Sequence, residues 1–140
     1  MSNTKKIELG KNNYCFVCGE KNPRGLQLRI TRDGEKGAKA EFVADQYYGG
    51  WTNYLHGGIV SMIFDELLGW ISIYVGKDAV TARLQVRYYK PVPLGSRLIF
   101  KGFLQREAKG LLEITTFAYL EDGQLAAKGQ GRMMIVNRQG

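Results

Sequence analysis

The sequence predicts an α+β fold in which an antiparallel sheet wraps round one long central helix. Residues from about 57 to 75 are apolar on nearly every side, as in a helix that is covered all round. Most of the remaining chain alternates between polar and apolar residues, with the period of two that is typical of half-buried strands. An antiparallel sheet long enough to curl round the helix is the simplest cover for it.

Length and composition fit one domain. The chain has 140 residues, of which 44% are hydrophobic and 24% charged, with a net charge of +7. We expect residues 1–13 to be a flexible segment and residues 14–140 to form a single domain. The polar N-terminus lacks the apolar core of a secretory signal, and polar residues interrupt the longest apolar run. These features predict a cytoplasmic protein that does not span a membrane.

The first expected elements are a cysteine-containing turn and a hairpin. Cys15 and Cys18 form a CxxC pair, but a zinc site normally takes four ligands, and the chain adds only one histidine. Two alternatives stay open: a zinc site with ligands from both chains of a dimer, and a redox dithiol. A compact structural turn is favoured, and no metal is expected. Residues 26–31 and 38–44 alternate as strands, and Asp33-Gly34 between them indicates a hairpin.

A glycine- and tyrosine-rich loop at 45–52 leads into the helix, which Gly76 is expected to end. Residues 80–89 alternate as a strand with two faces. One face is expected to carry Val80, Ala82, Leu84, Val86 and Tyr88, and the other Thr81, Arg83, Gln85, Arg87 and Tyr89. Further strands are predicted at about 97–107, 111–120 and 124–136, with Asp122-Gly123 turning the last hairpin.

Two neighbouring carboxylates lie in the middle of the apolar helix, where burial is costly unless they have partners. At 100° per residue, Asp65 shares a stripe of small residues that could admit a ligand. That stripe contains Gly58, Ser61, Gly69 and Ser72. Glu66 faces apolar neighbours, so we expect it to have a raised pKa or to pair with a strand arginine such as Arg83 or Arg87. Asp65 is therefore the better candidate for chemistry.

The start of the helix suits a developing negative charge. His56-Gly57-Gly58 places glycines where the first backbone N–H groups have no partner inside the helix. Gly57 and Asp65 are eight residues apart, or about 12 Å along the axis. An oxyanion donor and a general base must both reach one reacting centre. We therefore expect the Gly57 end of one copy to meet Asp65 of another across a two-fold axis.

The segment HGGIVSMIFDELLGW, followed by AVTARLQVRYYKPVPLG, resembles the acyl-CoA thioesterases of the phenylacetic-acid-pathway and thioesterase-superfamily-member type. The opening CFVCGEKNPRGLQL is similar to one bacterial branch of that group, and the resemblance covers roughly residues 14–136. It implies the hotdog fold, a long helix wrapped by an antiparallel sheet, and association into a homodimer or a dimer of dimers.

The resemblance also implies roles for individual residues. Asp65 matches the general base or nucleophile, and Gly57 of the partner subunit matches the backbone N–H that polarises the thioester carbonyl. His56 matches the motif histidine, which orients the carbonyl or simply bonds nearby backbone. Thr81 matches a position that helps to hold the attacking water. A side-chain helper found in several relatives is absent, because Gly50 occupies its position.

Coenzyme A enters as part of the substrate, and no separate cofactor is expected. In these relatives it lies along the dimer edge, which gives part of the +7 charge a purpose. The residues expected to bind substrate are Gly58, Ser61, Thr81, Arg87, Tyr89, Lys90, Arg106, Lys109 and Gly110.

The function expected from this resemblance is hydrolysis of acyl-CoA to free acid and CoA. Two alternatives stay open. One is a hydroxyacyl-thioester dehydratase using His56 with Glu66 or Asp65, and the other is a non-catalytic acyl-CoA-binding module. Nucleic-acid binding is not expected, because no helix-turn-helix or aromatic–basic motif is present.

Overall fold

The computed structural model describes residues 13–136 and contains one long helix and six strands. Their bounds are β1 Thr31–Arg32, β2 Gly37–Val43, α1 Gly57–Tyr74, β3 Ala79–Tyr88, β4 Arg97–Ala108, β5 Leu111–Leu120 and β6 Leu125–Ile135. A short 3-10 turn, η1 Gln46–Tyr48, lies in the loop before α1. The proposed flexible segment 1–13 falls outside the described residues except for Asn13, so the division at residue 14 stays a prediction.

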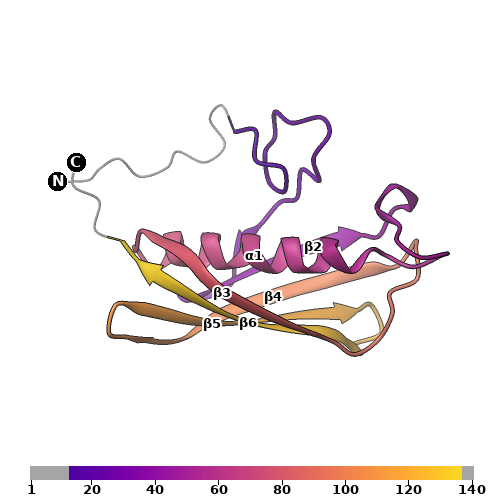
Figure 1. Cartoon of the computed structure of the whole chain (residues 1–140). Helices are drawn as coiled ribbons and strands as arrows, with labels where there is room; N and C mark the ends of the chain where they lie inside the picture. Colours follow the sequence, from indigo (N-terminus) through magenta and orange to yellow (C-terminus); the bar gives the residue numbers. More distant parts are fainter. Residues whose placement is uncertain (1–12, 137–140) are drawn as a thin grey trace.

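Every strand pairs antiparallel with its neighbours, in the order β1-β2-β4-β5-β6-β3. Figure 1 shows α1 lying along one face of this curved sheet. The α+β prediction of a helix wrapped by an antiparallel sheet is confirmed. Both hairpins predicted from Asp-Gly pairs form, with Gly34 and Gly123 at positive φ angles.

α1 begins at Gly57 because the preceding histidine caps it, and it ends just before Gly76, whose φ of 78° breaks the helical path. Its sheet-facing side chains are fully buried and share the spacing of one helical face. They are Ile63, Phe64, Leu67, Leu68 and Ile71. Burying each one stabilises the fold by about 1.5–3 kcal/mol. α1 has the length and hydropathy of a membrane span, as the core helix of a wrapped sheet also does.

Two glycines in β6 allow α1 to lie close to the sheet. A Cβ atom at Gly129 would come within 2.7 Å of the Phe64 ring, and one at Gly131 within 2.7 Å of a Leu68 methyl. Real Cβ atoms do not approach other heavy atoms so closely, and both neighbouring side chains are fully buried. The absence of side chains at these two positions therefore sets the distance between helix and sheet.

β3 contains a bulge that the alternation of residues 80–89 did not predict. Thr81 pairs with Met133 and Arg83 with Arg132, which leaves Ala82 as an extra residue on β3. The bulge reverses the faces of the residues before it. Thr81 therefore shares the helix-facing side of the sheet with the buried Met133, whereas Val80 is 44% exposed. The predicted faces are wrong for residues 80 and 81 and correct from residue 83 onward.

The predicted strand 26–31 is also largely absent, because only Thr31 and Arg32 pair with β2. Residues 13–30 form turns that lie over α1 on the side away from the sheet (Figure 1). Their backbone bonds return to the cysteine turn, with the N–H groups of Leu26 and Leu28 donating to carbonyls of residues 16 and 17. Gln27, at φ 50°, interrupts the extended path between them.

Candidate active site

The start of α1 presents one backbone N–H with no acceptor among residues 13–136. The Gly58 N–H donates to Nδ1 of His56 at 2.8 Å, and the Ile59 N–H donates to the His56 carbonyl at 3.0 Å. The Gly57 N–H is left without an intramolecular partner within this part of the chain. Because Nδ1 accepts a bond, the neutral His56 ring carries its proton on Nε2. The histidine therefore bonds nearby backbone and shapes the helix start.

Tyr88, at the end of β3, was not predicted as a site residue and holds this helix start in place. Its hydroxyl donates to the Gly57 carbonyl at 2.7 Å and lies 2.6 Å from the Ser61 hydroxyl. The ring is 50% exposed and flanks Gly57. The sequence signal for Tyr88 was its place on the same predicted strand face as the apolar Leu84 and Val86.

A hollow of about 260 Å³ opens beside the helix start. Its lining includes Gly57, Tyr88, Tyr89 and Lys90, and the rest is apolar. Two of the predicted substrate-binding residues, Tyr89 and Lys90, are thus brought next to the free Gly57 amide. Arg87 lies on the other face of the sheet with Arg83 and does not line this hollow.

Asp65 lies farther along α1 and is held by Thr81. The Thr81 hydroxyl donates to Oδ1 of Asp65 at 2.9 Å, which fixes the carboxylate and leaves Oδ2 available. The bulge in β3 makes this bond possible by turning Thr81 toward the helix. Asp65 is exposed in the chain described here, so the expectation of a carboxylate buried by its own chain is wrong.

The small-residue stripe beside Asp65 is only partly open. Gly69 has empty space where a side chain would lie, and Ser61 is half-buried. Ser72 is buried and donates to the Gly69 carbonyl at 2.7 Å, so it does not line the cavity of about 450 Å³ that contains Asp65.

Glu66 faces a different environment from its neighbour. The Trp70 indole N–H donates to Glu66 at 3.0 Å, the Cys15 thiol lies 3.5 Å from it, and the Cys18 thiol is also hydrogen-bonded to it. The expected pairing with Arg83 or Arg87 is wrong, because both arginines lie on the far face of the sheet. Burial, together with a hydrogen bond to Glu66, raises the pKa of the Cys18 thiol to about 12.

The predicted site residues fall into two groups within one chain. Gly57 lies near the end of β3, whereas Asp65 bonds Thr81 near its beginning. The eight-residue separation corresponds to about 12 Å along α1. One chain therefore does not bring the free amide and the carboxylate to the same reacting centre.

The expected phosphate-binding residues are also divided. Lys109 and Gly110 turn the hairpin between β4 and β5, next to the end of β6 and the beginning of β3. Lys90 follows the opposite end of β3. Arg106, Lys109 and Gly110 thus do not join Lys90 in one site within a single chain, because the 109–110 turn and Lys90 lie at opposite ends of the strands.

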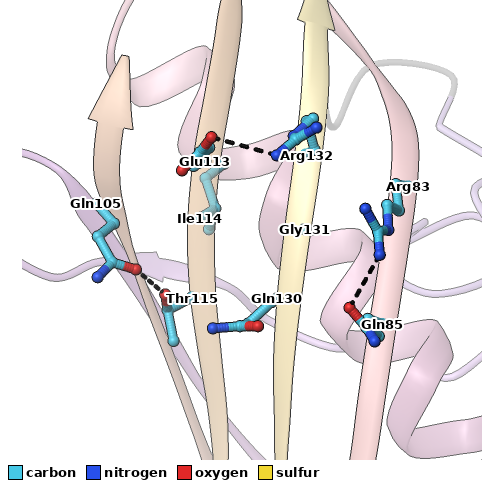
Figure 2. Close-up of a pocket in the computed structure, with 9 residues that line it drawn as sticks. All are labelled: Arg83, Gln85, Gln105, Glu113, Ile114, Thr115, Gln130, Gly131 and Arg132. Atoms are coloured by element: carbon cyan, nitrogen blue, oxygen red, sulfur yellow. Dashed lines mark hydrogen bonds and ion pairs between the residues drawn. The ribbon is translucent and has the colours of Figure 1, made fainter. Parts of the chain in front are cut away.

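A polar hollow of about 190 Å³ lies on the face of the sheet away from α1 (Figure 2). Figure 2 shows the Glu113–Arg132 ion pair between β5 and β6 and the Arg83–Gln85 hydrogen bond along β3. No residue predicted to take part in catalysis or substrate binding lines it. This hollow is therefore separate from both groups of candidate residues.

One long helix packed against a curved antiparallel sheet in the order β1-β2-β4-β5-β6-β3 is a hotdog fold. Residues 52–127 match the family model of the thioesterase superfamily, and the chain belongs to that family.

Solved structures with the same hotdog fold include a Streptococcus mutans UA159 protein bound to acetyl-CoA, with a TM-score of 0.75 and 19% identity over 81% of this chain and 91% of that one. A hypothetical thioesterase from Streptococcus pneumoniae TIGR4 with coenzyme A has a TM-score of 0.74 and 18% identity, over 81% and 88% of the two chains. The E. coli PaaI protein of the phenylacetic acid degradation operon has a TM-score of 0.75 and 15% identity, over 80% and 81%. These similarities confirm the fold.

Proposed function

We propose that this protein hydrolyses acyl-CoA thioesters to a free acid and CoA. The observation that carries the proposal is the Asp65 carboxylate, exposed to a cavity and oriented by the Thr81 hydroxyl at 2.9 Å. Its membership of the thioesterase superfamily supports the same reaction class.

The spacing of this pair has a parallel in a structural neighbour. Two further structures of the S. pneumoniae hypothetical thioesterase carry single alanine substitutions, one of an aspartate and one of a threonine, sixteen positions apart. Asp65 and Thr81 are also sixteen positions apart. This correspondence supports treating the two side chains as one functional unit.

In the proposed reaction Asp65 activates water, which attacks the thioester carbonyl carbon while the carboxylate takes the water proton. The carbon–sulfur bond then breaks, and the departing thiolate receives that proton. In the alternative route the carboxylate attacks the thioester carbonyl carbon and displaces the CoA thiolate; water then opens the resulting mixed anhydride, regenerating the carboxylate, and one of its protons goes to the thiolate. Trapping with hydroxylamine during a single turnover distinguishes them, because only the anhydride yields a hydroxamate on Asp65.

The Gly57 N–H of the partner subunit stabilises the negative charge that develops on the carbonyl oxygen. The separation of about 12 Å between Gly57 and Asp65 within one chain supports this shared arrangement. We therefore propose a homodimer or a dimer of dimers, acting in the cytoplasm. His56 supports the reaction indirectly, by capping the helix and leaving the Gly57 amide free.

Lys90 beside the helix start is the proposed contact for CoA phosphates, with Tyr89 as a flanking surface. The net charge of +7 favours an anionic substrate in the same way. The structures of the two streptococcal neighbours contain acetyl-CoA and CoA.

The test is thiol release from a panel of acyl-CoAs by the wild type and by Asp65→Asn. We expect the substitution to lower kcat by at least about a hundredfold, because an amide takes up no proton. Asp33→Asn, in the exposed turn between β1 and β2, is the matched control and should keep full activity.

Three outcomes contradict the proposal. Equal thiol release by Asp65→Asn excludes this carboxylate. Interconversion of hydroxyacyl-CoA and enoyl-CoA without thiol release indicates a dehydratase. Tight binding of acyl-CoA without turnover of any substrate indicates a binding module.

A further inference from the structure

The CxxC turn and α1 bring together three side chains that can bind a metal. The Cys15 and Cys18 sulfurs and a Glu66 carboxylate oxygen all lie within 4.8 Å of one another. We propose that Cys15, Cys18 and Glu66 bind a Zn²⁺ ion. The proposal is independent of thioester hydrolysis, since none of its three ligands takes part in that reaction.

The distances fit tetrahedral zinc. With Zn–S of about 2.3 Å and Zn–O of about 2.1 Å, a sulfur and an oxygen on one tetrahedral ion lie about 3.6 Å apart. The Cys15 sulfur lies 3.5 Å and 3.7 Å from the two Glu66 oxygens. The Cys15 sulfur and the Glu66 carboxylate are therefore already spaced as two ligands of one zinc ion, and the Cys18 sulfur lies within 4.8 Å of both.

The cysteine turn is already arranged to hold a thiolate. The N–H groups of Val17 and Cys18 both donate to the Cys15 sulfur, each at 3.4 Å. Gly19 closes the turn where a side chain would come within 2.8 Å of the Asn13 carbonyl oxygen. Two N–H groups directed at one sulfur are supporting hydrogen bonds of the kind that orient metal-binding side chains.

The other two ligands also have supporting contacts. The Trp70 indole donates to Glu66 at 3.0 Å, and the Asn13 amide donates to the Cys18 sulfur at 3.5 Å. Metal-binding carboxylates commonly have such partners, which orient them toward the ion. No lysine or arginine among residues 13–136 pairs with Glu66, so a divalent cation is the natural counter-charge for three converging acidic groups.

The ion would join the N-terminal turns to the central helix. Residues 13–30 have no strand of their own and cover α1 through a few buried side chains, including Val17, Leu28 and Ile30. Three protein ligands leave one tetrahedral position for water, and all three ligands line the same cavity as Asp65. Zinc therefore stabilises one wall of that cavity.

The test uses the full-length protein purified with Zn²⁺ and then dialysed against metal-free buffer. Elemental analysis should give about one zinc per chain, and Co²⁺ substituted for zinc should show thiolate-to-metal charge-transfer absorption. A strong chelator should lower the thermal unfolding midpoint by several degrees without abolishing the fold.

Cys15→Ser, Cys18→Ser and Glu66→Gln should each reduce bound zinc at least about tenfold. Asp65→Asn and Glu113→Gln are matched controls, one adjacent in sequence and one on the far face of the sheet, and should keep full zinc content. Circular dichroism verifies that each variant is folded. If the cysteine variants fold poorly, Glu66→Gln still tests the site, because it leaves both cysteines of the turn unchanged.

Two results overturn the proposal. Unchanged zinc content in folded Glu66→Gln excludes the carboxylate as a ligand. If the protein binds neither Zn²⁺ nor Co²⁺, and mild oxidation converts both free thiols to a disulfide, then Cys15 and Cys18 form a redox dithiol and not a metal site. Because both measurements are independent of turnover, they stand whether or not the protein hydrolyses acyl-CoA.

Discussion

The free amide at the start of α1 can be removed without disturbing the helix, by Gly57→Pro. Gly57 is the first helical residue, where proline is tolerated because its missing N–H has no partner inside the helix. The preceding His56, at φ −63° and ψ 128°, already has the extended conformation that a following proline requires. A Cβ at Gly57 would meet the Tyr88 ring at an ordinary 3.5 Å.

Gly57→Ala is the matched control, since it adds the same Cβ and keeps the N–H. Removing one oxyanion donor typically lowers kcat by about a hundredfold to a thousandfold. We expect that loss in Gly57→Pro and only a small change in Gly57→Ala, measured as steady-state thiol release from acyl-CoA. Circular dichroism should show equal helix content in both variants.

Mixing two inactive variants then tests whether the site is shared. In a mixed dimer of Gly57→Pro and Asp65→Asn chains, one site combines the intact Asp65 of the first chain with the intact Gly57 of the second. The other site lacks both groups. Random pairing makes half of the dimers mixed, so co-expression should restore about a quarter of wild-type activity.

Two results would refute this reasoning. If Gly57→Pro is as active as Gly57→Ala, the amide does not stabilise the transition state. If both variants are inactive and their co-expression restores nothing, although mixed dimers are isolated by two affinity tags, each site takes both groups from one chain. The second result would require a large movement of α1, because about 12 Å separates the groups along the helix.

Three further predictions concern the carboxylate, the core and the phosphate contact. Thr81→Val removes a hydrogen bond, worth about 1.5–3 kcal/mol, to the proposed catalytic carboxylate of Asp65, so kcat should fall about tenfold to a hundredfold. Thr81→Ser keeps the hydroxyl and should keep most activity in the same thiol-release assay. Gly131→Ala forces a methyl group against the buried Leu68 side chain and should lower the free energy of unfolding by about 1–3 kcal/mol, measured by urea unfolding. An unchanged unfolding midpoint would show that the helix can shift outward. Lys90→Ala should raise the KM for acyl-CoA several-fold with little change in kcat, and the rise in KM should be larger at low salt. Lys39→Ala, at an exposed position on the outer face of the sheet, is the control and should change neither constant.

The elements that the sequence predicted well depend on local signals. Apolar spacing and a terminal glycine placed the helix at 57–75, within a residue of α1. The Asp-Gly pairs placed both hairpins correctly. Such signals lie within a few residues of the structure they predict, so no knowledge of the tertiary fold was needed.

The position of Thr81 could not be derived from alternation. A bulge adds one residue to a strand without changing its polar–apolar pattern, and the strict period placed Thr81 on the same face as Arg83 and Gln85. The family resemblance placed it at the site instead. The extra residue Ala82 explains why Thr81 lies beside Asp65 and not on the face that alternation gave it.

The environment of Glu66 could not be predicted from the sequence for a different reason. Its thiol neighbour lies 51 positions away in the sequence, and helical periodicity cannot indicate what covers the outer side of a helix. Periodicity also could not show that Lys90 and Lys109 lie apart, because their separation depends on how the strands pair and not on spacing along the chain.

The adjacency of Asp65 and Glu66 now has a physical explanation. Successive helical residues point about 100° apart, so one position is enough to direct one carboxylate toward Thr81 on β3 and the other toward the cysteine turn. The helix thereby links the two layers that enclose it. A cation held by Glu66 would fix the N-terminal turns against the same helical turn that carries Asp65, so losing it should loosen the cavity wall before it affects the sheet.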